Sequence, residues 1–148
     1  MIAYNGGFEK PELWLDKLTN KKKFFLATSI NFCQDFLDDM VEEDIPVKAY
    51  ITKWRINPEL IADPDYLFGF EKFQQELDNH ASLELDKSLK DYCNSKEMIG
   101  IWMRESQTAT ICIYPDLLVR KLQCLGYETY IYNFEKNTYE YDSSTNFS

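Results

Sequence analysis

Two short segments in the last third of the chain most constrain its fold. In each of them nearly every residue is apolar, so a strand formed there would have two apolar faces. Residues 98–103 are MIGIWM, and residues 109–114 are ATICIY. Strands that are apolar on both faces lie centrally in a sheet that is covered on both sides. The polar residues 104–107 between the two segments predict a hairpin. We therefore expect a sheet that is packed between layers of helix.

Helical periodicity is clearest in residues 24–43. Apolar and small side chains recur there at steps of three and four, which predicts one stripe of an amphipathic helix that Pro46 ends. Residues 24–28 alone also fit a strand, so the start of this helix is open. The stripe consists of Phe25, Ser29, Phe32, Cys33, Phe36, Leu37, Met40 and Val41.

Four further helices are expected from starts, stops and apolar spacing. They cover about residues 11–19, 67–77, 82–93 and 115–125. Gly126 stands where a left-handed cap would end the last of them. A strand before and after that helix would make a right-handed crossover between parallel strands.

Alternation of apolar and polar residues predicts three more strands, at 47–54, 127–134 and 138–142. Residues 1–8 are expected to be an arm or a short strand that Gly6 and Gly7 interrupt. The fold class is therefore α+β. Residues 1–142 form a single domain with a mixed sheet of four to five strands and about five helices, and residues 143–148 form a frayed tail.

Composition excludes several classes of function. The 148 residues include 25 Asp and Glu against 16 Lys and Arg, a net charge of −9, which disfavours direct binding to nucleic acid. No apolar run approaches the length of a membrane span, and no signal peptide is seen, so we expect a cytoplasmic protein. The cysteines Cys33, Cys93, Cys112 and Cys124 have no metal-ligand spacing, and we expect reduced thiols, no metal and no cofactor.

Catalytic patterns are weak. The one histidine, His80, stands in a polar break beside Asp78, and the glycines form no phosphate-binding motif. A carboxylate pair is not singled out among 25 acids. We therefore do not expect an enzyme, although a small metal-independent enzyme that uses His80 or a carboxylate pair remains an alternative.

The most informative polar feature is a run of acids in the second half of the helix at 24–43. At 100° per residue they gather on one side, against the helix dipole and without an intervening cation. The face is either simply solvated or binds a basic partner, and in the second case we expect charge reversal at Asp38 and Glu42 to leave stability unchanged. The acids proposed for partner binding are Asp35, Asp38, Asp39, Glu42 and Glu43.

Tyrosines on the last predicted hairpin form a second candidate surface. Tyr130 and Tyr132 share one face of a strand, and Tyr139 and Tyr141 share one face of its partner. Such residues either pack under a helix and against each other, or make an exposed edge that binds a protein.

Residues 97–134 combine the pattern MIGIWM, then ICIYPDLL, then LGY and YIY. This stretch resembles the closing strand–strand–helix–strand of bacterial toxin-immunity-type proteins. The resemblance implies an immunity protein that neutralises a toxin. With the acidic charge, we expect that toxin to be cationic, in particular a nuclease, and to be inhibited by stoichiometric occlusion. We expect a monomer or a homodimer. A phage or mobile-element polyanion mimic that acts on a DNA-handling protein is the alternative binder.

Overall fold

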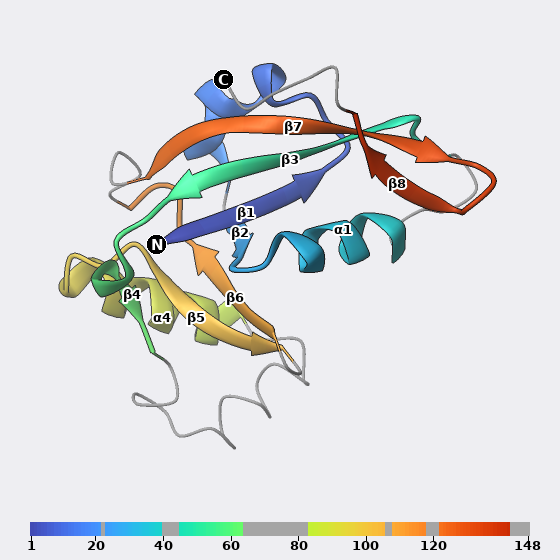
Figure 1. Cartoon of the computed structure of the whole chain (residues 1–148). Coiled ribbons are helices and arrows are strands. Elements are labelled where there is room, and N and C mark those ends of the chain that lie inside the picture. The colour runs from blue at the N-terminus through green and yellow to red at the C-terminus, as the bar shows by residue number, and fades with distance from the viewer. Residues whose placement is uncertain (22, 40–44, 64–82, 106–107, 118–121, 143–148) are drawn as a thin grey trace.

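One mixed sheet of eight strands organises the computed structural model, which describes residues 1–21, 23–39, 45–63, 83–105, 108–117 and 122–142 (Figure 1). The strand order is β4-β5-β6-β2-β1-β3-β7-β8, and all neighbours are antiparallel except the parallel pair β4–β5. The expected combination of helices with one mixed sheet is confirmed, but the expected number of four to five strands is too low. The strands are β1 (Ile2–Gly7), β2 (Phe24–Ala27), β3 (Lys48–Arg55), β4 (Ile61–Ala62), β5 (Gly100–Glu105), β6 (Thr108–Ile113), β7 (Gln123–Asn133) and β8 (Thr138–Tyr141).

Two α-helices, α1 (Ile30–Asp39) and α4 (Leu83–Ser95), cover the same face of this sheet. Phe25 and Cys112 are register partners in β2 and β6, so their side chains lie on one face. Cys112 packs in the core under α4, and Ala27, two residues from Phe25, packs in the core under α1. The 3₁₀ helices η1 (Pro11–Leu13) and η2 (Leu15–Asn20) cover the opposite face, whereas η3 (Pro58–Leu60) leads into β4 (Figure 1).

The predicted apolar hairpin is confirmed as β5 and β6, which lie inside the sheet. Ile101 and Cys112 pack toward α4, whereas Trp102 and Ile111 pack on the other face. This double coverage is the reason that neither strand carries a polar face.

Of the two expectations for the N-terminal residues, an arm or a short strand, the strand is confirmed, but the two glycines do not interrupt it. Residues 2–7 form β1, an interior strand between β2 and β3, and both glycines are paired within it, with Ile51 and Tyr50 as partners. A Cβ atom on Gly6 would lie 3.4 Å from Cγ of Leu37. That is an ordinary van der Waals distance, so α1 packs directly on β1 at Gly6, and the two glycines continue the strand and do not interrupt it.

The helix predicted over 24–43 is divided. Phe24 to Ala27 form β2, the alternative that the sequence had left open, because Phe24 and Leu26 are buried, Phe25 is exposed, and the segment pairs with β6. The described part of α1 starts at Ile30 and ends at Asp39. A stripe that runs across a strand–turn–helix boundary can keep helical spacing by coincidence.

The helix expected at 115–125 is wrong at both ends, since residues 115–117 form a turn and a bend and β7 already begins at Gln123. Gly126 is not a helix cap but lies at an irregularity in the β3–β7 pairing, with a φ of 120° that favours glycine. β6 and β7 run in the same direction but are separated by β2, β1 and β3, so they form no crossover between neighbouring strands.

The remaining elements follow the predictions closely. The segment at 11–19 is helical but 3₁₀, and the strands at 47–54 and 138–142 and the helix at 82–93 appear as β3, β8 and α4. The helix predicted at 67–77 and the tail at 143–148 lie outside the described residues.

Candidate protein-binding surface

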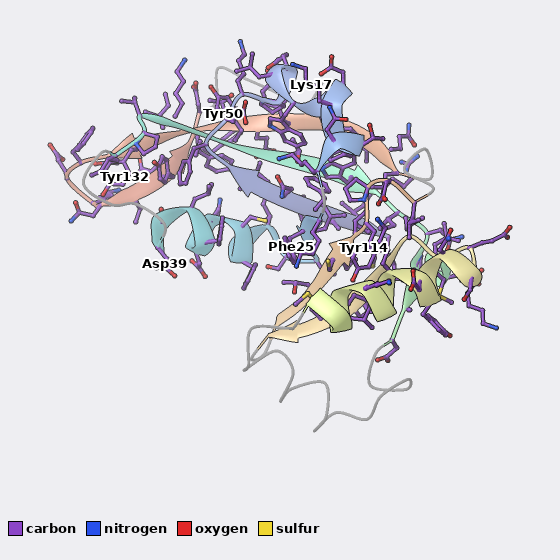
Figure 2. The ribbon with its side chains drawn as sticks, turned by 180° about the vertical axis from the view of Figure 1, so that it is seen from behind. Lys17, Phe25, Asp39, Tyr50, Tyr114 and Tyr132 are labelled. Atoms are coloured by element: carbon purple, nitrogen blue, oxygen red, sulfur yellow. The ribbon has the colours of Figure 1, made fainter. Side chains whose placement is uncertain are left out.

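Helix α1 separates a buried side from an acidic outer side. Cys33 and Leu37 are buried against the sheet. Asp35 and Asp39 are exposed on the opposite side, and Figure 2 shows Asp39 pointing away from the sheet. We call these two residues the acidic outer face of α1. Glu42 and Glu43 lie outside the described residues.

No cation relieves this acidic outer face. Residues 24–47 contain neither lysine nor arginine, and within the described ranges neither Asp35 nor Asp39 takes part in an ion pair. Acids one turn apart repel each other by roughly 0.2–0.5 kcal/mol. Acids in the last turn of a helix destabilise it by about a further 0.3–1 kcal/mol, because this end of the helix dipole is negative. The arrangement therefore costs stability and gains none from local contacts.

Asp38 differs from its neighbours, because it holds β8 in place. Its Oδ1 atom accepts a hydrogen bond of 2.8 Å from the backbone N–H of Tyr139. β8 is the last strand of the sheet, so this carboxylate occupies a donor of an edge strand. Charge reversal at Asp38 would remove this acceptor, so we now expect it to lower stability, unlike charge reversal at the neighbouring acids. The same bond brings the acidic helix and the tyrosine hairpin together.

The tyrosine hairpin is mainly a packed core. Tyr130 faces Tyr141 and Tyr132 faces Tyr139 across β7 and β8. Tyr130, Tyr132 and Tyr139 are at most 7% exposed, whereas Tyr141 is 45% exposed. Packing under a helix thus describes three of the four, and only Tyr141 presents a surface to a partner.

Hydrogen bonds fix the buried hydroxyl groups. Gln34 Nε2 on α1 donates to Tyr130 Oη at 3.5 Å, and Tyr130 Oη donates to Glu128 Oε2 at 2.9 Å. Tyr139 Oη donates to the carbonyl oxygen of Pro46 at 2.6 Å. Burial is the main cause that raises the pKa of both Tyr130 and Tyr139, so neither phenol ionises near neutral pH.

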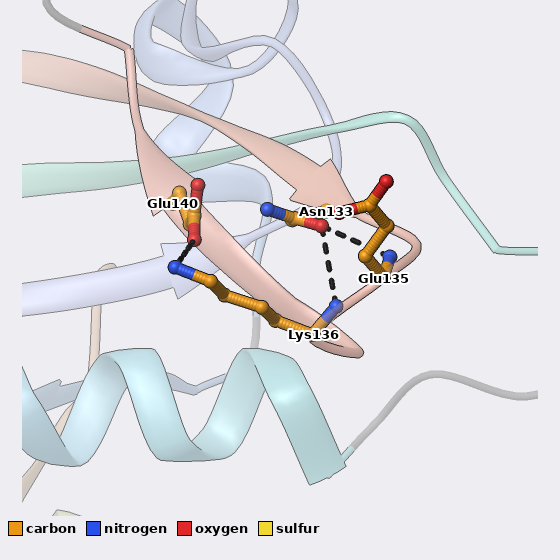
Figure 3. Close-up of polar contacts among 4 residues, drawn as sticks. All are labelled: Asn133, Glu135, Lys136 and Glu140. Carbon is orange, nitrogen blue, oxygen red and sulfur yellow. Dashed lines mark hydrogen bonds and ion pairs between the residues drawn. The ribbon is translucent and has the colours of Figure 1, made fainter.

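Apolar side chains are exposed around the same end of the molecule. Phe134 is 63% and Val47 is 55% exposed, and Ile131 and Tyr141 follow at 39% and 45%. Phe134 opens the turn between β7 and β8, where Asn133 Oδ1 accepts from the N–H groups of Glu135 and Lys136 (Figure 3). The sequence analysis did not propose Val47 or Ile131 as binding residues, and single apolar residues at strand ends give no signal that could have done so.

Lys136 and Glu140 pair at 3.5 Å along the rim of this turn (Figure 3). Both side chains are largely exposed, so the pair adds little stability. β3, β7, β8 and the residues that flank them carry both signs of charge: the acids Glu128, Glu135, Glu140 and Asp142, and the cations Lys48, Lys53, Arg55 and Lys136.

Catalytic groups do not gather in the described part of the chain. Cys33, Cys93 and Cys112 are buried, and burial raises the pKa of Cys33 to about 12 and that of Cys93 to about 11. Such thiols are poor nucleophiles. His80 lies outside the described residues. Within the described ranges, no three His, Cys, Asp or Glu side chains are placed to hold a metal ion, and no helix is long and apolar enough to cross a membrane.

Comparisons of the chain with protein-family models, with curated proteins and with solved structures gave no significant match.

Proposed function

We propose that this protein is an acidic protein-binding inhibitor that binds a basic partner through α1 and the adjoining β7–β8 hairpin. The observation that carries the proposal is the acidic outer face of α1, which is exposed and forms no ion pair with the residues that the structure describes. Such a face is expected to destabilise a helix and so calls for another role. The bond between Asp38 and Tyr139 fixes this face beside exposed apolar side chains.

The two kinds of side chain have complementary roles. Exposed acids such as Asp35 and Asp39 would attract a basic protein over long range and raise the association rate. Apolar groups such as Tyr141 and Phe134 would be desolvated at contact and slow dissociation. An acidic surface with apolar residues beside it thus fits binding of a folded basic protein better than binding of a small ion.

A toxin domain that degrades nucleic acid is the partner class that we favour, because its substrate is a polyanion and its cleft must be basic. Occlusion of that cleft would inhibit it at a ratio of one to one and without turnover. A polyanion mimic that acts on a DNA-handling protein would use the same face.

The test starts with capture of the partner on the immobilised chain. The variant Asp35→Lys with Asp39→Lys is compared with Asp91→Lys with Glu59→Lys, which makes the same charge change on exposed acids elsewhere. We expect the control and the unaltered chain to capture the same basic protein and the α1 variant to lose it. The captured protein should then be inhibited completely at one equivalent.

Two outcomes would contradict the proposal. One is equal capture by both double variants, which would mean that the acidic outer face is only solvated. The other is an activity of the purified chain itself on a substrate panel, which would favour the small-enzyme alternative.

A further inference from the structure

Helix α1 borders an apolar groove on the flank opposite β8. The groove has a volume of about 320 Å³ and lies between α1 and strands β1, β2 and β6. Phe32 and Phe36 of α1 form one wall, Phe25 of β2 stands opposite, and Tyr4 and Thr110 line it from β1 and β6. Figure 2 shows Phe25 where α1 separates from the β5–β6 hairpin.

The groove has two structural causes: the helices leave part of the sheet face uncovered, and the pairing between β1 and β2 is short. α1 and α4 cover separate parts of one sheet face, so neither covers Phe25. β1 and β2 pair only at Tyr4 and Ala27, and beyond that point the side chain of Asn5 donates to the carbonyl oxygen of Phe25 at 2.8 Å. A side-chain bridge takes the place of the next backbone pairing and leaves the sheet open.

The walls of the groove are unusually exposed for large apolar residues. Phe25 is 46% and Phe36 is 42% exposed. Walls this open would cover one side of an inserted group but would not enclose a free small molecule, which buries roughly 70–90% of its surface in a typical pocket. The geometry thus favours a side chain that a larger partner carries.

The acids beside the groove indicate which residues should flank the inserted side chain of the partner. Asp35 is three residues from Phe32, and Asp39 is three residues from Phe36, so each acid neighbours a groove residue on the helix surface. A segment that enters the groove therefore passes the acidic outer face of α1. Lysine or arginine on both sides of the inserted residue would complement it.

We propose that this groove receives one large apolar side chain of the partner, presented in a segment with lysine or arginine on either side. The inference rests on the proposed function and specifies which feature of the basic partner is recognised. It places the apolar anchor in the groove and leaves the charge attraction to Asp35 and Asp39.

Two peptides separate these contributions. One has a tryptophan between two pairs of lysines, and the other has serine in place of the tryptophan. Their affinities for the full chain are measured by calorimetry at low ionic strength, and contacts are mapped by NMR shifts. We expect the tryptophan peptide to bind about tenfold more tightly, with shifts around Phe25 and Phe36.

Variants assign each contribution to its residues. Phe36→Gln and Phe25→Thr suit a helix and a strand, and each should reduce the tenfold ratio toward one. Leu13→Ser removes a still more exposed apolar side chain, which lies on the opposite face, and should leave the ratio unchanged. Asp35→Asn with Asp39→Asn should weaken both peptides equally and preserve the ratio.

Equal affinity for the two peptides would overturn the groove proposal. If Asp35→Asn with Asp39→Asn still weakened the binding of both peptides, the proposed function would stand. Loss of that response would count against the proposed function instead. Equal binding of a peptide with glutamates around the tryptophan would replace the proposal with a general apolar site. Self-association that Phe36→Gln abolishes would overturn it in favour of a second copy of the chain.

Discussion

Helices α1 and α4 cover the same face of one sheet, and they bury their inner sides in the same way. Each places one leucine and one cysteine against the strands: Leu37 and Cys33 in α1, Leu89 and Cys93 in α4. Their outer sides differ. α4 carries Lys87 and Lys90 among its acids, and Lys90 pairs with Asp116, whereas the described part of α1 carries three acids and no cation.

This difference shows which features of the outer sides the fold itself requires. α4 shows that a helix on this sheet face can carry both signs of charge, so the sheet does not require an all-acidic outer side. The composition of α1 lowers its stability, and the burial of Leu37 and Cys33 has to offset that cost. The contrast is consistent with the proposal that the acidic outer face of α1 serves binding.

The largest expected effects come from the shared inner sides. Leu37 is fully buried and Leu89 is 2% exposed. Leu37→Ala and Leu89→Ala should each lower the free energy of unfolding by about 2–5 kcal/mol, through lost burial and the cavity left behind. Urea unfolding measures both. A cost below about 1 kcal/mol for only one of them would mean that its helix is not docked as described.

The buried thiols provide a second comparison. Because the pKa of Cys33 is raised to about 12 and that of Cys93 to about 11, few thiolates exist at pH 8. We expect both to react with a thiol reagent at least about a hundredfold more slowly than in the unfolded chain. Single-cysteine variants measure each rate. Reaction of Cys33 at the unfolded rate would show that α1 does not stay on the sheet.

Asp38 is predicted to have an intermediate effect. Asp38→Ala removes the acceptor for the Tyr139 N–H at the sheet edge, and a charge-assisted bond of this kind should outweigh the relief of helix-dipole conflict. Thermal unfolding should show a loss of about 1–2 kcal/mol. Asp38→Asn keeps an acceptor and should lose less, so equal losses in the two variants would contradict this role.

The smallest effects concern the outer sides themselves. Asp35→Lys with Asp39→Lys should leave the free energy of unfolding unchanged or raise it by about 0.5–1 kcal/mol. Lys87→Glu with Lys90→Glu should lower it by about as much, because it breaks the pair with Asp116 and adds like charges. Denaturant titrations of the two double variants test these opposite signs, and a loss in both would mean that the α1 acids stabilise the fold.

Local patterns predicted much of this fold. The alternation at 47–54 and the two-faced apolar segments at 98–114 identified β3, β5 and β6, because their side-chain periods match the faces they pack against. Gly6 and Gly7 suggested an interruption, because a local pattern does not contain the pairing of β1 with β3 that keeps both glycines in a regular strand. The same holds for β7, where distant β3 extends the strand back to Gln123.

The candidate site was predictable in part. Helical spacing placed Asp35 and Asp39 on an outer side, which the structure has as well. It did not distinguish Asp38, whose role depends on a bond to Tyr139, 101 residues away. Nor could it find the groove, because Phe25 and Phe36 come from a strand and a helix that meet only in the folded chain.

The most direct test of the contrast between α1 and α4 is the rate at which the captured basic protein associates with the chain at low and at high salt. Asp35→Lys with Asp39→Lys should slow association at low salt by about tenfold or more and flatten its salt dependence. Asp91→Lys with Glu59→Lys makes the same change in net charge away from α1 and should cost far less. Equal rates for the two double variants would contradict the proposal that the acidic outer face of α1 serves binding.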